Sequence, residues 1–172
     1  MAEARRHVKI ICDDGEIQVP HELARKWDLI EGMEFAAENN FLENSDVYDF
    51  RQLFEQKLYN SKDLVKLIVE WQEYHLHDPP EFHDDIFHKF NKEVHPWDRS
   101  FFDIDRNKLF DFVKLVNFIG IPDLFEAQCR YLNSLMKGKS TEEIRRDLNI
   151  QYDFTDEEYA QIIEETKWCD EN

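Results

Sequence analysis

The stretch Val-Lys-Ile-Ile-Cys-Asp-Asp-Gly-Glu-Ile-Gln-Val, residues 8–19, decides the fold class at the N-terminus. Apolar side chains alternate along residues 8–12, as expected for a strand with one buried face. Residues 13–16 supply turn chemistry, and residues 17–19 continue as a second apolar strand. We therefore predict an N-terminal β-hairpin.

The chain after the hairpin changes to helical patterning. Pro20 stops the second strand and opens a helix that carries Leu23, Ala24, Trp27 and Ile30. The pattern weakens over residues 31–49, where acidic and Asn side chains predict a frayed helix and a loop. Residues 54–59 are expected to supply a short third strand.

A further helix is predicted over residues 61–77, because Ser61 is a good N-cap and apolar side chains recur at helical spacing. Asp78-Pro79-Pro80 cannot continue a helix, so we expect this one to end near His77. Residues 78–96 are polar and rich in turn residues, which predicts a mobile connection.

The remainder of the chain is helical by pattern. Asp105 caps a segment that Gly120 ends, and Pro122 opens the next helix. Two capping boxes, Ser140–Glu143 and Thr155–Glu158, open two short helices.

The predicted fold is an α/β protein of the α+β kind, mainly helical. A unit with a hairpin and a short third strand comes first, and a C-terminal helical extension follows. The expected divisions are residues 1–77, 78–96, 97–138 and 139–172.

The charge balance disfavours several classes of function. The 172 residues hold 21 Lys and Arg against 38 Asp and Glu, a formal net charge of −17. Such a field repels phosphate backbones and anionic lipid, so we expect neither nucleic acid nor a membrane surface as a partner. The four glycines are too far apart for a phosphate-binding loop.

Cysteine use is typical of a reducing compartment. Cys12, Cys129 and Cys169 form no CxxC pair and are odd in number, so we expect no disulfide framework and a cytoplasmic and nuclear location. No signal-peptide pattern follows Met1, and polar and charged residues interrupt the longest apolar run, Phe110–Ile121. We expect no membrane span.

Catalysis and metal binding are not favoured. Five of the seven histidines fall between residues 75 and 95, but they match no metal-ligand spacing and no cysteine is close. We interpret that stretch as a solvated polar loop that contains His75, His77, His83, His88 and His95 with Asp78, Asp84 and Asp85. Four serines fall at caps or on helix surfaces, Ser61, Ser100, Ser134 and Ser140. We predict a protein that is not an enzyme and holds no metal and no cofactor.

The helix that starts at Pro122 shows two apolar stripes, which is more than one core contact needs. The first stripe is Leu124, Ala127, Tyr131 and Leu135, and the second is Phe125, Cys129, Leu132 and Met136. Either this helix is buried on two sides within its own fold, or the second stripe docks a helical partner.

The last 33 residues, 140–172, combine a net charge of −8 with scattered large apolar side chains. Two short helices cannot build a core of their own. We therefore expect the chain itself to leave Leu148, Ile150 and Trp168 bare, for a partner to cover.

Several blocks carry a resemblance to a known family. They are Val94-His95-Pro96-Trp97-Asp98, Asn117-Phe118-Ile119-Gly120-Ile121, residues 136–145, Asp153-Phe154-Thr155 and Lys167-Trp168-Cys169. In this order they resemble the Skp family, the S-phase-kinase-associated adaptors of SCF ubiquitin ligases. The match runs from about residue 94 to the C-terminus, whereas residues 31–60 match poorly.

The resemblance implies a BTB/POZ unit whose C-terminal extension binds the F-box of a substrate receptor, while the BTB side binds a cullin. The implied cullin contacts are Asn117 and Phe118, the latter at a place where the family usually carries Tyr. The implied F-box contacts are Phe125, Leu132, Met136, Ile144, Leu148, Ile150 and Trp168.

The function that this resemblance implies is that of a non-enzymatic adaptor, which bridges an F-box receptor to a cullin scaffold for ubiquitin-dependent protein degradation. The alternative is a structural paralogue that self-associates through its BTB half, as a homodimer, and acts outside the ligase.

Overall fold

The predicted hairpin is present in the computed structural model. Strand β1 (His7–Cys12) pairs antiparallel with β2 (Gly15–Pro20), with Val8 opposite Val19. The side chains of Val8, Ile10 and Cys12 are buried, which is the alternation that the sequence pattern predicted. The structure describes residues 6–39, 46–53, 60–79, 92–151 and 154–170.

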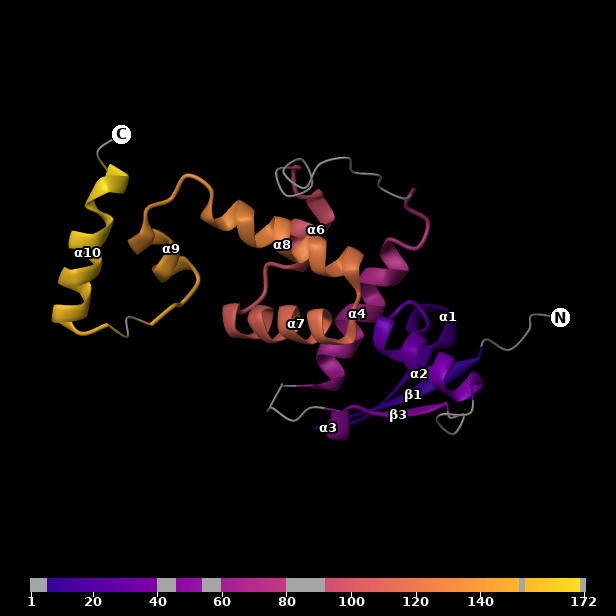
Figure 1. The fold of residues 1–172 in the computed structure, drawn as a ribbon. Coiled ribbons are helices and arrows are strands. Elements are labelled where there is room, and N and C mark those ends of the chain that lie inside the picture. Colours follow the sequence, from indigo (N-terminus) through magenta and orange to yellow (C-terminus); the bar gives the residue numbers. More distant parts are fainter. Residues whose placement is uncertain (1–5, 40–45, 54–59, 80–91, 152–153, 171–172) are drawn as a thin grey trace. The chain divides into compact units, whose positions relative to one another are not determined.

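A third strand completes the sheet, at a different place from the predicted one. Strand β3 (Val47–Asp49) pairs parallel with β1, so the strand order is β2-β1-β3 (Figure 1). It lies inside the stretch expected to be a frayed helix and loop, and the predicted strand at 54–59 falls outside the described residues. Three residues that pair with a strand almost forty positions away leave no local periodicity to detect.

The structure contains two helices where the sequence predicted a single helix with a frayed end. They are α1 (His21–Ala24) and α2 (Asp28–Glu38), and the short α3 (Phe50–Leu53) follows β3. The break is at Trp27, which has an extended backbone (φ −90°, ψ 119°). Its buried indole Nε1 donates to Oε1 of Gln72 at 2.9 Å, so a tertiary contact overrides the helical pattern.

Helix α4 (Lys62–Tyr74) begins where it was predicted and ends earlier. The Ser61 side chain accepts from the Leu64 N–H at 3.3 Å, and Asp14 of the hairpin turn accepts from the Lys62 N–H at 2.8 Å. The helix stops at Tyr74 rather than near His77, and His75 forms its C-cap. Helices α1 and α4 pack against strands of the sheet, and α4 also contacts α1.

Among the described residues, three further helices belong to the first compact unit of the chain, Met1–Ser134. They are α6 (Pro96–Phe101), α7 (Arg106–Ile119) and α8 (Pro122–Met136), whose last two residues fall in the second unit. As predicted, Asp105 caps α7 and Gly120 ends it, with φ +71°. The chain comes close to itself there, because a Cβ on Gly120 would lie 2.5 Å from Cβ of Asp28. Helix α7 packs against α2 and α4.

The second compact unit, Leu135–Asn172, contains α9 (Thr141–Asp147) and α10 (Asp156–Asp170). In the part of the chain that the structure describes, no helix has both the length and the apolar character needed to cross a bilayer.

Candidate partner-binding surfaces

Helix α9 of the second unit is held at its start by the predicted capping box. The Ser140 hydroxyl accepts from the Glu143 N–H at 3.3 Å, and the Glu143 carboxylate accepts from the Ser140 N–H at 2.8 Å. The hydrogen bond from the Ser140 backbone N–H to the carboxylate, followed by the Ser140 side chain, holds the pKa of Glu143 below its ordinary value. The Lys139 ammonium also lies 2.8 Å from the Asp147 carboxylate, which links the two ends of the helix.

The turn at the end of α9 separates a buried apolar side chain, Leu148, from an exposed one, Ile150. Asn149 adopts φ +55°, and the Ile150 N–H returns to the Arg145 carbonyl at 2.8 Å, the hydrogen bond of a Schellman turn. Leu148 is only 5% exposed, whereas Ile150 is 49% exposed. The expectation that Leu148 is left bare is therefore wrong, because the turn that reverses the chain directs this side chain inward.

Helix α10 presents apolar side chains to solvent. Thr155 and Glu158 form the second predicted capping box, with the Thr155 N–H and hydroxyl each 2.9 Å from the Glu158 carboxylate. Trp168 is 69% exposed, and Ile162 and Ile163 are also exposed. The charged side chains of this helix do not cover these apolar groups.

Phe154, just before α10, is exposed as well, and the Arg145 guanidinium carbon lies 5.9 Å from its ring centroid. Phe154, Ile162 and Ile163 were not among the implied F-box contacts. Their signal in the sequence was present, since they are large apolar residues in capped segments too short to bury them.

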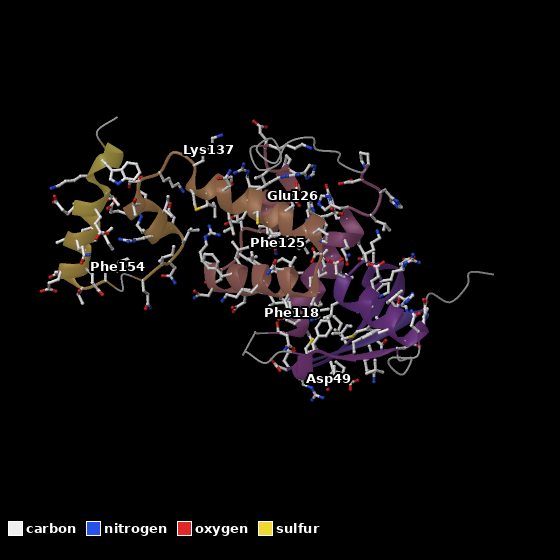
Figure 2. The ribbon with its side chains drawn as sticks, viewed as in Figure 1. Asp49, Phe118, Phe125, Glu126, Lys137 and Phe154 are labelled. Atoms are coloured by element: carbon white, nitrogen blue, oxygen red, sulfur yellow. The ribbon has the colours of Figure 1, made fainter. Side chains whose placement is uncertain are left out.

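The two stripes on α8 differ in burial as well as in composition. Leu124, Ala127 and Tyr131 of the first stripe are buried, and the Tyr131 ring packs 5.6 Å from that of Phe102. The four residues of the second stripe are only half-buried: Phe125, Cys129, Leu132 and Met136 (Phe125 is labelled in Figure 2). The lone chain therefore leaves part of the second stripe available.

The two implied cullin contacts lie near the end of α7, in the first unit. Asn117 is exposed, and Phe118 is 44% exposed although the residues on either side of this pair, Val116 and Ile119, are fully buried (Figure 2). The helical register thus directs Asn117 and Phe118 outward together, while the next residues of the same turn hold the helix in the core.

The implied F-box contacts are divided between the two units. Phe125 and Leu132 belong to the first unit, and the other five belong to the second, Met136, Ile144, Leu148, Ile150 and Trp168. Of these five, Met136 and Ile144 are half-buried, Leu148 is buried, and Ile150 and Trp168 are exposed.

The histidine stretch contains a fixed hydrogen-bonded group rather than only solvated side chains. His75 places its ring nitrogens 2.5 Å from Asp78 and 3.0 Å from Asp98, and Asp98 also accepts from the Trp71 indole at 3.0 Å. Within the described ranges no group of three or more His, Cys, Asp or Glu side chains could hold a metal ion. His83, His88, Asp84 and Asp85 lie outside the described residues.

Three serine hydroxyls in the described part of the chain have structural roles, and burial affects two cysteine thiols. Ser61 and Ser140 cap helices, and the Ser134 hydroxyl donates to the Tyr131 carbonyl at 2.7 Å. Burial raises the pKa of the Cys12 thiol to about 12, and burial followed by the nearby Glu126 raises the pKa of Cys129. A thiol with a raised pKa is a poor nucleophile at neutral pH.

These features define a class of protein: a mainly helical α+β chain whose C-terminal helices present apolar side chains to solvent. Comparison with known proteins identifies the class more closely. Residues 122–169 match the family described as Skp1 family, dimerisation domain. A Skp1-related protein of Caenorhabditis elegans is 30% identical over 174 residues, which cover 99% of this chain and 95% of that protein. The chain belongs to the Skp1 family, as the resemblance predicted.

Shorter matches are found to fungal proteins. An "E3 ubiquitin ligase complex SCF subunit sconC" of Arthroderma benhamiae is 37% identical over 113 residues, or 64% of this chain and 69% of that protein. "Suppressor of kinetochore protein 1" of Schizosaccharomyces pombe is 34% identical over 114 residues, or 64% of this chain and 71% of that protein.

Proposed function

We propose that this chain is a non-enzymatic adaptor subunit of an SCF-type E3 ubiquitin ligase. It binds the F-box of a substrate receptor through its C-terminal helices and a cullin scaffold through its first unit. Support comes from family membership and from the relatives whose names describe them as SCF subunits. The adaptor carries out no chemistry, and its task is to join a receptor to the scaffold.

The observation that carries this proposal is the exposure of apolar side chains in the second unit. Trp168, Ile150 and Ile163 are large and apolar and lie in a segment with a strong excess of negative charge. An acidic surface keeps the free chain soluble, while its apolar side chains supply the contact area for a helical partner. The half-buried stripe on α8 adds Phe125 and Leu132 to the same kind of contact.

Truncation of Trp168 tests the F-box interaction. Because a large exposed aromatic is a typical interface anchor, we expect Trp168→Ala to weaken binding of a purified F-box domain about 30-fold or more, measured by isothermal titration calorimetry. Trp168 does not support the core, so the variant should unfold at the same urea concentration as the parent.

Phe35→Ala is the matched control, since Phe35 is a comparably exposed aromatic, 64% exposed, in the first unit. It should leave F-box affinity unchanged. Equal affinities for the parent and Trp168→Ala would contradict the proposed role of the extension.

Phe118→Ala separates the two interfaces, because it should reduce co-precipitation of a cullin N-terminal domain and leave F-box binding intact.

Two further expectations belong to the same proposal. We propose a cytoplasmic and nuclear site of action, which imaging of the tagged full-length chain would test. Self-association through the BTB half remains a prediction, and sedimentation velocity of the chain with and without cullin would test it. A dimer that does not bind cullin would favour the alternative function outside the ligase.

A further inference from the structure

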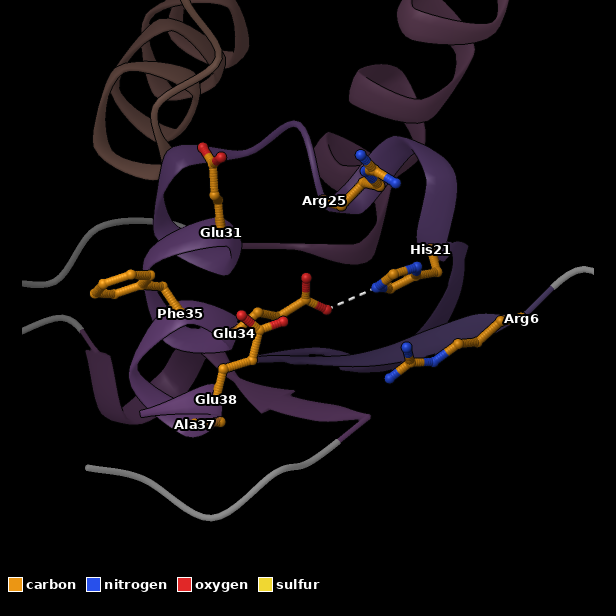
Figure 3. Close-up of a pocket in the computed structure, with 8 residues that line it drawn as sticks. All are labelled: Arg6, His21, Arg25, Glu31, Glu34, Phe35, Ala37 and Glu38. Carbon is orange, nitrogen blue, oxygen red and sulfur yellow. Dashed lines mark hydrogen bonds and ion pairs between the residues drawn. The ribbon is translucent and has the colours of Figure 1, made fainter. Parts of the chain in front are cut away.

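A cavity of about 440 Å³ opens on the first unit between α1 and α2. Figure 3 shows that α2 supplies one wall, with Glu31, Glu34, Phe35 and Glu38, and that His21 lies across from them. This volume is in the range of sites that accept a small ligand or a large side chain. None of these residues is among the implied F-box or cullin contacts.

One of the three carboxylates is engaged within the fold. Glu34 lies 2.6 Å from Nε2 of His21 and also accepts from the Tyr48 hydroxyl at 3.4 Å. Tyr48 is only 6% exposed, and burial, followed by the Glu34 charge, raises the pKa of its hydroxyl to about 12. The Arg6 guanidinium, at the edge of the cavity, forms an ion pair with Asp46.

The other two carboxylates are available to a ligand. Glu31 and Glu38 are exposed, and neither has a hydrogen bond or ion pair to any part of the chain that the structure describes. They are seven residues apart, so they lie about two turns apart on one side of α2. Phe35 lies between them along the helix and is 64% exposed, the largest value among the large apolar side chains that the structure describes in this unit.

We propose that this cavity is a docking site for a protein partner that inserts an arginine side chain. A guanidinium stacks on an aromatic face and donates in parallel to carboxylates, and Phe35 with Glu31 and Glu38 offers both features on one helix. Arg25 lines the opposite side, so its charge directs an incoming cation to the α2 wall. The net charge of −17 attracts basic partners from a distance.

Blocked amino acids provide the probes for a direct test on the full-length chain. We expect N-acetyl-arginine amide to produce saturable NMR shifts of the Phe35 and His21 ring signals. N-acetyl-citrulline amide has nearly the same shape without the charge and should produce none. Glu31→Gln with Glu38→Gln should weaken binding of the arginine probe about tenfold or more, whereas Glu70→Gln on α4 should leave it unchanged.

Four outcomes would overturn the proposal, and the first three concern the probes. These are equal shifts with arginine and citrulline, stronger shifts with N-acetyl-glutamate amide, or no shift at any concentration. A fourth is a dimer of the chain, detected by sedimentation velocity and abolished by Phe35→Ser, because a second copy would then be the occupant. The substituted side chains are exposed, so circular dichroism of each variant should match that of the parent.

Discussion

At the scale of single residues, Gln128 is a polar side chain in a fully buried position. Its side chain on α8 is fully buried, and neither Oε1 nor Nε2 has a hydrogen-bond partner within the described residues. It shares the buried face of α8 with Leu124 and Tyr131. A buried amide without partners costs free energy that an apolar side chain of the same size would not.

Gln128→Met should therefore stabilise the protein by about 1–2 kcal/mol, measured as the free energy of unfolding in urea. Gln72→Met is the matched opposite case, because the Gln72 carbonyl accepts from the buried Trp27 indole. It should destabilise by about 1–3 kcal/mol. A loss of stability in Gln128→Met would show that its amide has a partner in solution.

Residues that act through distant contacts were the hardest to predict from sequence. His75 and Asp98 are 23 positions apart, so their hydrogen bond could not be deduced from any local spacing. Leu148 was misjudged for a similar reason, since its burial depends on the Asn149 backbone, and Asn rather than Gly stands at that left-handed position. Trp168 and Ile150 were predicted correctly to be exposed, because short acidic helices offer nothing to bury them.

At the scale of elements, two glycines have opposite surroundings: Gly120 lies at the contact between α7 and α2, and Gly32 lies within α2. Gly120 has φ +71°, and a Cβ there would meet Cβ of Asp28 at 2.5 Å, whereas Gly32 on α2 has open space around it. The Asp28 N–H also donates to the Gly120 carbonyl at 2.9 Å, so the end of α7 and the start of α2 are held together.

Gly120→Ala should destabilise the protein by about 2 kcal/mol or more, because it adds a clash to an unfavourable backbone conformation. Gly32→Ala should instead stabilise by about 0.5–1 kcal/mol, since Ala is the better helix former and meets no neighbour. Thermal and urea unfolding of the two variants check this. Similar losses in both would show that α2 does not tolerate a methyl group where the structure leaves space.

The capping boxes of α9 and α10 predict an acid-sensitive extension. The backbone N–H groups of Ser140 and Thr155 hold the pKa values of Glu143 and Glu158 below their ordinary value of 4.5. A lowered pKa in the folded state stabilises the helix fully above pH 4.5, and this contribution is lost as the pH falls through the folded value.

Residue-level NMR shifts of residues 140–151 and 154–168 should thus show α9 and α10 losing helicity below pH 4.5. The double variant Glu143→Gln with Glu158→Gln should show a smaller acid response over the same range. If both proteins responded equally, the two carboxylates would not be responsible for the acid sensitivity.

The hairpin and several helix ends followed from local chemistry, whereas the third strand and the break between α1 and α2 did not. Ser61, Asp105, Gly120 and the two capping boxes were readable, because a cap depends on residues within one turn. Strand β3 depends on a parallel pairing with β1, and the break between α1 and α2 depends on a contact of Trp27 with Gln72. Such long-range contacts leave no periodic trace in the sequence.

At the scale of the whole molecule, the chain forms two compact units, which differ in how many of their large apolar side chains they bury. The first buries large aromatic and aliphatic side chains, among them Trp27, Phe50, Phe102 and Phe112. The second buries Leu148 and leaves Ile150, Phe154, Ile162, Ile163 and Trp168 exposed. Leu148→Asp would therefore disturb the extension itself, which makes Trp168 the cleaner probe of an interface.

Amide hydrogen exchange of the full-length chain, with and without a saturating F-box domain, tests the central claim most directly. We predict weak protection of residues 154–168 in the free chain and a gain in protection concentrated there and in α9 on binding. Protection of the core strands and α7 should change little. Strong protection of α10 in the free chain, or no change in the extension at saturation, would contradict the account.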